Sequence, residues 1–215
     1  MSEYAERGSF TPVPLDPSKR AWLITSSAAG AVGAVALAAP FAASFAPSEK
    51  ARAAGAAVEV DISELKPGEK MTVAWRGKPV WILRRTPEML DSLASLDGKL
   101  ADPMSEHQGG YPIPPYAQNR ARAREEHEEF LVLVGICTHL GCSPSDRFAT
   151  GPQPSLPDDW PGGFFCACHG STFDLAGRVY KDKPAPVNLQ VPRYMFLSDT
   201  TLVIGQDEDG EGDVV

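Results

Sequence analysis

The sequence has few basic residues for its length. Its 215 residues include 20 lysines and arginines against 28 aspartates and glutamates, which gives a formal net charge of −8 and a pI of about 5.0. Proteins that bind nucleic acid contact its phosphates with a positively charged surface. The composition therefore argues against nucleic acid as a partner, whereas 43% hydrophobic and 22% charged residues are typical of a folded protein.

Charge is missing altogether from one long run. Residues 22–45 contain no charged side chain, and Lys19 and Arg20 stand directly before them. A helix rises about 1.5 Å per residue, so this run is long enough to cross a hydrocarbon core of about 30 Å. We predict a membrane anchor over residues 21–46, with residues 1–20 on the cytoplasmic side. The alternative is a cleaved signal peptide, but the run exceeds the roughly 7 to 15 apolar residues of such a peptide.

The chain after the anchor has the period-two alternation of β-strands. Apolar residues alternate with polar ones, or form short buried runs, at 58–62, 71–75, 80–83, 130–136, 164–165, 194–197 and 202–204. We therefore predict a mainly β protein, with a single N-terminal transmembrane helix and an antiparallel β head over residues 58–205. Residues 47–57, rich in alanine, are expected to form a flexible hinge, and the acidic residues 206–215 a solvated tail.

Three segments interrupt this β pattern. Thr86 followed by Pro87 predicts the start of a short helix. Residues 118–129 are highly charged and are expected to form a helix or a loop. Residues 143–163 are rich in proline and glycine, and we expect a surface loop there.

Cysteine and histidine are scarce and gather in two short motifs. Residues 137–142 read C-T-H-L-G-C and residues 166–171 read C-A-C-H-G-S, which together hold all four cysteines and two of the four histidines. The other two, His107 and His127, have no second ligand-type residue at a useful spacing. We expect both to be surface residues.

The two motifs predict a metal site. Two cysteines and two histidines can surround either a tetrahedral zinc ion or an iron-sulfur centre. Zinc fingers usually separate a cysteine pair from a histidine pair, whereas each motif here mixes the two types, which suits a cofactor with two unlike metal ends. Structural zinc and ordinary structural cysteines are the alternatives.

One cysteine of each motif is available for a disulfide. Cys168 is adjacent to His169, and neighbouring side chains of an extended segment point in opposite directions, so both rarely reach one cofactor. Cys166 is therefore the better ligand. Cys142 and Cys168 are left free to join the two loops, and a disulfide between them requires an oxidising compartment.

Both motifs closely resemble those of the Rieske iron-sulfur subunit of cytochrome bc complexes, the quinol:cytochrome c oxidoreductases. The resemblance covers roughly residues 20–205 and includes W-R-G-K-P at 75–79, P-A-P at 184–186 and N-L-Q-V-P at 188–192. It implies one Rieske [2Fe-2S] cluster, bound in a subdomain of about residues 135–186. In such a centre two cysteines hold one iron and two histidines hold the other.

The resemblance implies a role for each residue of the two motifs. The implied metal ligands are Cys137, His139, Cys166 and His169. The implied disulfide joins Cys142 and Cys168. Beside the cluster we expect Leu140, Gly141 and Ser171, the last of which matches a serine that donates a hydrogen bond to sulfur.

Phe173 is a departure from many high-potential members of the family. These relatives have a tyrosine at this position, whose hydroxyl donates a further hydrogen bond, and phenylalanine has no hydroxyl. Hydrogen bonds to sulfur stabilise the reduced, more negative state of a cluster. We therefore predict a redox potential somewhat below that of those relatives.

The implied function is proton-coupled electron transfer by a subunit of a proton-translocating oxidoreductase. The cluster accepts one electron from quinol at the quinol-oxidation site and passes it to a c-type cytochrome haem, in a respiratory or photosynthetic chain. His139 and His169 are the expected catalytic residues, because an imidazole that binds iron through one nitrogen can offer the other nitrogen to the quinol. The expected partners are cytochrome b and c-type cytochrome subunits, quinol and membrane lipid, within a dimeric complex.

The expected location is the bacterial inner membrane, with a single span and the head on the periplasmic side. Residues 18–23 look like a degenerate twin-arginine export signal, with lysine at the first basic position. The alternative function is that of the Rieske subunit of a periplasmic oxidase such as arsenite oxidase. Soluble Rieske ferredoxins are a weaker alternative, because they typically lack the extra cysteine pair and the anchor.

Overall fold

The computed structural model describes residues 16–46, 56–107 and 109–209. The chain divides into two units, residues 1–50 and residues 51–215, which are described separately. The expected hinge at 47–57 lies outside the described residues except for its last two positions. Only residues 16–20 of the expected cytoplasmic segment and 206–209 of the expected acidic tail are described.

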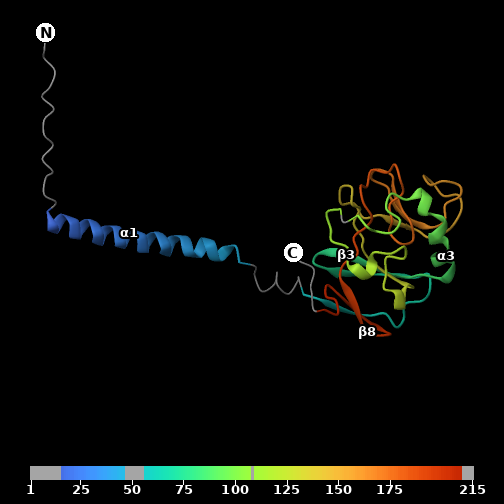
Figure 1. Cartoon of the computed structure of the whole chain (residues 1–215), viewed down its shortest axis with the longest axis horizontal. Helices are drawn as coiled ribbons and strands as arrows, with labels where there is room; N and C mark the ends of the chain where they lie inside the picture. Colours follow the sequence, from blue (N-terminus) through green and yellow to red (C-terminus); the bar gives the residue numbers. More distant parts are fainter. Residues whose placement is uncertain (1–15, 47–55, 108, 210–215) are drawn as a thin grey trace, which may run out of the picture. The chain divides into compact units, whose positions relative to one another are not determined.

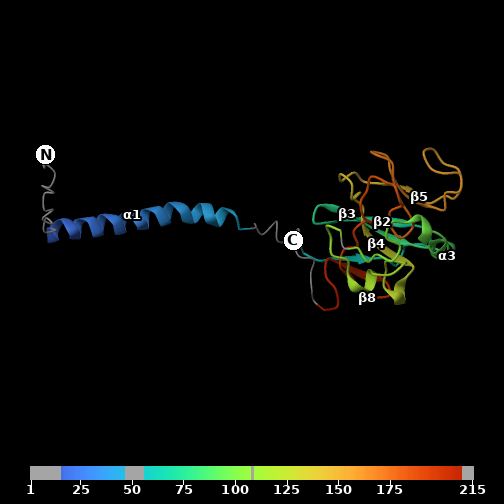
Figure 2. The ribbon, with the colours of Figure 1, turned by 45° about the horizontal axis from the view of Figure 1, so that its top comes forward.

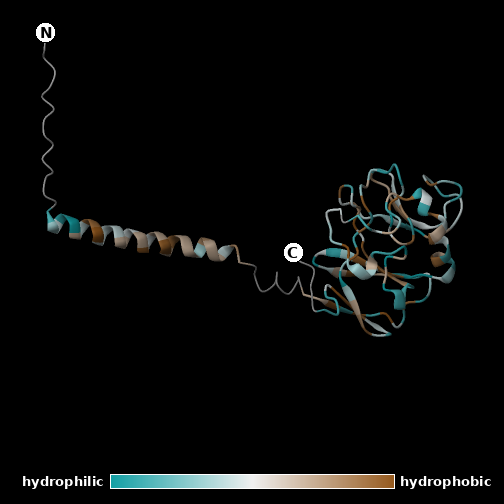
Figure 3. Cartoon of the chain, viewed as in Figure 1, coloured by the Kyte–Doolittle hydropathy of each residue, from teal (hydrophilic) through white to brown (hydrophobic). Residues whose placement is uncertain are grey.

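The first unit contains one long helix, α1 (Pro17–Ser44). It begins after Asp16, whose side chain accepts a hydrogen bond from the Ser18 amide and thereby satisfies one of the free amides of the first turn. The helix continues through Pro40 and ends before Phe45. All of its side chains are exposed, and Figure 3 shows the apolar residues along its length. It is long and apolar enough to cross a membrane, as the sequence predicts.

The second unit contains three antiparallel sheets of three strands each in its described residues. The first sheet has the order β1 (Val58–Asp61), β9 (Thr201–Ile204), β8 (Tyr194–Ser198), and the second the order β2 (Lys70–Trp75), β3 (Lys78–Arg84), β4 (Phe130–Val134). The third sheet has the order β5 (Ser145–Arg147), β6 (Gly163–Cys166), β7 (Ser171–Phe173). The mainly β, antiparallel fold is therefore confirmed (Figure 1).

The second sheet lies between the other two. In Figure 2 the labelled strands β2, β3 and β4 lie between β8 and β5. Trp81 of β3 stacks on Phe164 of β6 with 5.0 Å between ring centroids, which joins the second sheet to the third. At the other sheet, Trp75 packs so closely against Gly205 that a Cβ there would lie 2.5 Å from the indole nitrogen. These two tryptophans tie the three sheets into one core.

Local sequence explains the strands and their turns. β2 and β3 pair through a tight turn at Arg76 and Gly77, both with positive φ (50° and 72°), which matches the right-handed twist of a hairpin. All five residues of β4 are buried, so its continuous apolar run is a core strand. Gly135 follows β4. A Cβ at this position would lie 2.2 Å from the Trp81 ring, so only glycine fits here beside the indole.

The predicted short helix is α3 (Pro87–Ser95). The Thr86 side chain accepts a hydrogen bond from the Met89 amide at 3.3 Å, and Pro87 occupies the first turn. The short 3-10 turns η1 (Asp97–Lys99), η2 (Pro115–Ala117) and η3 (Glu125–His127) complete the helical elements of the described residues.

Two expectations about loops need correction. Residues 143–163 are not only a surface loop, because Ser145–Arg147 forms β5 and pairs with β6. Trp160 is buried and its indole nitrogen donates to the Arg147 carbonyl at 2.8 Å. His107 is exposed as expected, whereas His127 is half-buried against Phe196, with ring centroids 4.0 Å apart.

Candidate metal centre

Two tight loops carry the cysteine and histidine motifs. The first follows β4 and closes on itself, because the Cys137 amide donates to the Cys142 carbonyl at 2.7 Å and the Gly141 amide to the Cys137 carbonyl at 3.1 Å. The second joins β6 to β7, where Gly170 donates to the Cys166 carbonyl at 2.9 Å. Gly141 and Gly170 both have positive φ, 82° and 80°, which glycine adopts at no steric cost. Each loop thus presents one histidine at a glycine-dependent turn.

A disulfide joins the two loops. Cys142 and Cys168 are bonded, at a sequence separation of 26 residues. This confirms the pairing expected from the motifs. The disulfide lies directly beside the free thiol of Cys166, since the sulfur atoms of Cys142, Cys166 and Cys168 all lie within 4.8 Å of one another.

The two other cysteines are free, buried and adjacent. Cys137 and Cys166 are each 2% exposed. Burial raises the pKa of the Cys137 thiol and its contact with Cys166 acts in the same direction, although the His139 backbone and the Ser171 side chain lower it. A buried thiol whose pKa is raised, as that of Cys137 is, does not ionise unaided at neutral pH, and a metal ion supplies the charge that deprotonates a coordinating thiol. The pair therefore suits a metal rather than a free nucleophile.

The two histidines of the motifs form a second pair. The rings of His139 and His169 lie 4.6 Å apart between centroids and nearly perpendicular, at 88°. His169 is exposed, whereas His139 is half-buried and its Nδ1 is buried without a hydrogen-bond partner in the described residues. A buried polar atom without a partner costs about 1 to 3 kcal/mol, and a metal bond removes that cost. Two thiols and two imidazoles grouped in this way fit the ligand set of a Rieske [2Fe-2S] cluster.

Three further residues of the motifs surround these ligands. Leu140 is 71% exposed, and Gly141 beside it is exposed as well. Ser171 is fully buried, and its Oγ accepts a hydrogen bond from the Ala185 amide at 3.0 Å. Phe173 is also fully buried, so the position is apolar core without a hydroxyl donor.

A third loop, residues 181–189, packs against both motif loops. Thr138 of the first loop donates from its hydroxyl to the Val187 carbonyl at 2.7 Å, and Ala185 bonds to Ser171 of the second loop. Residues 184–186 (P-A-P) were not predicted from the sequence to lie at the metal centre. The two prolines restrict the backbone to extended conformations and are the sequence signal for an ordered loop here.

Comparison with known proteins defines the class of this chain. Residues 116–195 match the model of the Rieske [2Fe-2S] domain. The chain is 53% identical over 189 residues to the ubiquinol-cytochrome c reductase iron-sulfur subunit of Allochromatium vinosum, which covers 88% of each protein. It is 39% identical over 191 residues to the subunit of the same name from Bradyrhizobium diazoefficiens, over 88% of this chain and 95% of that one.

Among solved structures, a chain of the "Hyperthermophilic respiratory Complex III" is 27% identical, with a TM-score of 0.43, over 83% of this chain and 97% of that one. The matched Rieske domain and the identity to the bacterial subunits define the chain as a Rieske [2Fe-2S] protein. On the identity to the bacterial sequences, it belongs to the family of ubiquinol-cytochrome c reductase iron-sulfur subunits.

Proposed function

We propose that this chain accepts one electron from a quinol and passes it to the haem of a c-type cytochrome, as a subunit of a quinol:cytochrome c oxidoreductase. A Rieske cluster stores a single electron, at a potential that its two neutral imidazole ligands raise. Membership of the family supports this function, and so does the site, which holds a pair of free buried thiols and a pair of imidazoles.

Four residues are proposed as the ligands of the cluster. Cys137 and Cys166 hold one iron, and His139 and His169 hold the other. The support comes from the pairing of like residues: the two free thiols touch in the core, and the two rings meet at the surface. The disulfide removes the other two cysteines from consideration, because a disulfide sulfur is not a thiolate.

The observation that carries the proposal is the exposure of His169 and of the apolar side chain of Leu140, next to the half-buried His139. Buried thiols hold a cluster out of water, while His169 and the neighbouring Leu140 are open to a partner. An imidazole bound to iron through one nitrogen can accept a hydrogen bond from a quinol hydroxyl at the other, and can take its proton. Leu140 offers apolar surface of the kind that an apolar substrate or the apolar pocket of a partner covers.

The proposed location is the periplasmic side of a bacterial inner membrane. The helix α1 supports a membrane anchor, and the disulfide requires an oxidising compartment for the head. In this arrangement lipid surrounds α1, and the partners are cytochrome b and c-type cytochrome subunits of a dimeric complex. The degenerate twin-arginine motif at residues 18–23 is the proposed export signal.

The proposal is tested on the complex isolated from membranes through the full-length chain. We expect cytochrome b and c-type haem to copurify, and an added quinol to reduce the c-type haem. The variant His169→Ala should lose the cluster and this reduction, whereas His107→Ala, which changes an exposed histidine away from the motifs, should keep both. Absence of both cytochromes, or undiminished haem reduction in His169→Ala, contradicts the proposal.

A further inference from the structure

A buried cation, Arg122, has no part in the function proposed so far. Its side chain is 1% exposed, although the sequence around it is a highly charged stretch. A buried charge is costly unless hydrogen bonds compensate it. Burial lowers the pKa of Arg122 to about 10, against the opposing effect of Asp174 and Asp102, so the guanidinium stays charged at neutral pH.

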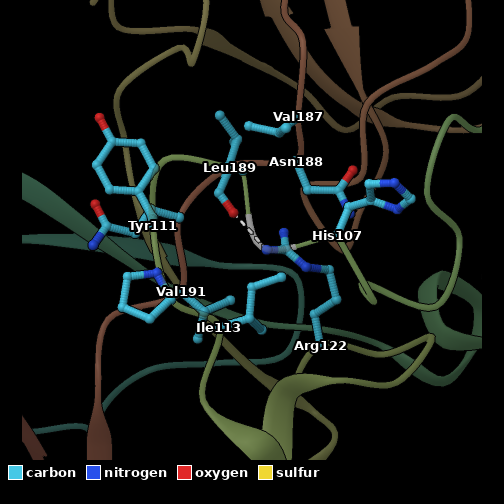
Figure 4. A pocket seen from close by; sticks show the side chains of 11 residues that line it. His107, Tyr111, Ile113, Arg122, Val187, Asn188, Leu189 and Val191 are labelled. Carbon is cyan, nitrogen blue, oxygen red and sulfur yellow. Dashed lines mark hydrogen bonds between the residues drawn. The ribbon is translucent and has the colours of Figure 1, made fainter.

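The hydrogen-bond acceptors of Arg122 are backbone carbonyls. Its Nη1 donates to Ala176 at 3.1 Å and to Gly177 at 3.2 Å, and its Nη2 donates to Leu189 at 2.5 Å. Figure 4 shows the guanidinium pointing to the Leu189 carbonyl, beside a cavity of about 10 Å³. The planar fork of arginine can serve several carbonyls at once, which the single ammonium of lysine cannot do in the same geometry.

These carbonyls belong to two segments that reach the metal centre. Ala176 and Gly177 form the turn after β7, the strand that begins with Ser171. Leu189 ends the third loop, four residues after Ala185. The Leu189 amide also donates to the Gly177 carbonyl at 2.9 Å. One guanidinium therefore fixes the turn that follows Ser171 against the loop that carries Ala185.

The two segments meet again at the Ser171 hydroxyl. The Ala185 amide donates to Ser171 Oγ at 3.0 Å, and both residues are buried. A hydroxyl has one proton and two acceptor lone pairs, so an amide bound to a lone pair leaves the proton free and restricts its direction. The Ser171 side chain lowers the pKa of the Cys137 thiol, so it acts on a proposed ligand. The Ala185 amide thus orients a hydroxyl that faces the metal centre.

We propose that Arg122 is a positioning residue of the metal centre. By holding Leu189 against the turn at Gly177, it keeps the Ala185 amide on Ser171 and so directs the serine hydroxyl toward sulfur. This inference rests on the proposed ligand set. Its consequence is a higher potential, because a hydrogen bond to sulfur stabilises the reduced state.

Glycine at position 177 is part of the same arrangement. Its φ is +70°, and a Cβ there would lie 2.7 Å from Leu133 and 3.2 Å from the Arg122 guanidinium. The absence of a side chain lets the guanidinium approach the backbone that it binds. The clamp therefore depends on both the arginine and the glycine.

The test is a redox titration of the cluster in the full-length protein, followed by EPR. Four variants are compared with the wild type: Arg122→Lys, Ser171→Ala, the double variant, and Arg120→Lys as the matched control. Arg120 lies two positions away, is exposed and forms an ion pair with Asp97. We expect Arg122→Lys to lower the midpoint by at least half of the shift that Ser171→Ala causes, and the double variant to match Ser171→Ala alone. Arg120→Lys should have the wild-type midpoint.

Several results overturn the inference. If Arg122→Lys has the wild-type midpoint, Arg122 only stabilises the fold. If the shifts of the two single variants add in the double variant, Arg122 affects the midpoint by a route other than Ser171. If the Arg122→Lys protein binds no cluster, the test uses Ala185→Pro instead, which removes the amide that donates to Ser171. An unchanged midpoint in Ala185→Pro then refutes the inference. An unchanged midpoint in Ser171→Ala refutes it too, while the proposed function stands on the His169→Ala result. A wild-type protein without a reduced [2Fe-2S] signal refutes the proposed function itself.

Discussion

Removal of the disulfide between Cys142 and Cys168 should make the head markedly less stable. In the chain-entropy description a crosslink stabilises by restricting the unfolded chain, with an entropy of about −2.1 − 1.5R ln n cal/mol/K for a closed loop of n residues. The sequence separation of 26 residues gives a loss of about 3.5 kcal/mol at 25 °C. For a head of this size, each kcal/mol corresponds to about 2 to 4 °C in Tm, so we expect a fall of roughly 7 to 14 °C.

The assay is thermal unfolding of the cluster-loaded full-length protein in detergent, followed by tryptophan fluorescence. Three buried tryptophans, Trp75, Trp81 and Trp160, report on the head. The double variant Cys142→Ala/Cys168→Ala is compared with the wild type, each with and without a thiol reductant. The reductant should lower the Tm of the wild type toward that of the variant and leave the variant unchanged. A fall below about 3 °C, or an equal effect of reductant on both proteins, refutes the reasoning.

Three further predictions concern the core and its charges. Phe173→Tyr should raise the cluster midpoint in a redox titration, because it restores a hydroxyl donor; an unchanged or lower midpoint contradicts this. Gly163→Ala should cost more than about 2 kcal/mol in denaturant unfolding, since φ is +150° and a Cβ would lie 2.1 Å from the Phe173 carbonyl oxygen. The control Gly98→Ala faces open space and should stay within about 0.5 kcal/mol; equal losses refute the steric reasoning. The hydrogen bond from Arg120 lowers the pKa of Asp97 in the folded protein. The resulting gain in the free energy of unfolding is fully present above the usual aspartate pKa of about 3.9 and is lost as the pH falls through the lower pKa of the folded state. Asp97→Asn should therefore be less stable than wild type at pH 7 and equal to it at strongly acid pH; a pH-independent difference contradicts this.

Local sequence signals were sufficient for the apolar helix, the disulfide and all the strands except β5 and β7. The alternation at 71–75 and 80–83, with a turn between, predicts the β2–β3 hairpin because strand periodicity and turn conformation are both local properties. The disulfide followed from the composition and spacing of two short motifs and their resemblance to a known family. The ligand assignment rests on the same motifs and stays a prediction until metal-bound protein is measured.

Long-range contacts were beyond the reach of sequence reasoning. The acceptors of Arg122 lie 54 to 67 residues away, so its stretch of charges has the pattern of a solvated face. Trp160 stood in a proline- and glycine-rich segment that predicts a surface loop, yet it fills space beside Tyr180, with ring centroids 5.7 Å apart. In both cases the partner is a backbone group or ring from another segment, and no periodicity within the segment reports it.

The anchor and the head are two separate units, and the function proposed here depends on both. The helix α1 supplies attachment to a membrane, and the head supplies the paired thiols and paired histidines. The charge-free run and the two motifs are far apart in sequence. Together they distinguish a membrane-anchored subunit from a soluble Rieske ferredoxin, which typically has neither an anchor nor a second cysteine pair.

The central claim is that a quinol electron enters a cluster held by His139 and His169. The most direct test is EPR of the isolated complex after reduction by a quinol alone, with nitrogen couplings resolved by histidine labelled with ¹⁵N. We predict the signal of a reduced [2Fe-2S] cluster with coupling to two histidine nitrogens, absent in His169→Ala and retained in His107→Ala. A signal without nitrogen coupling, or bound zinc with no signal, contradicts the account.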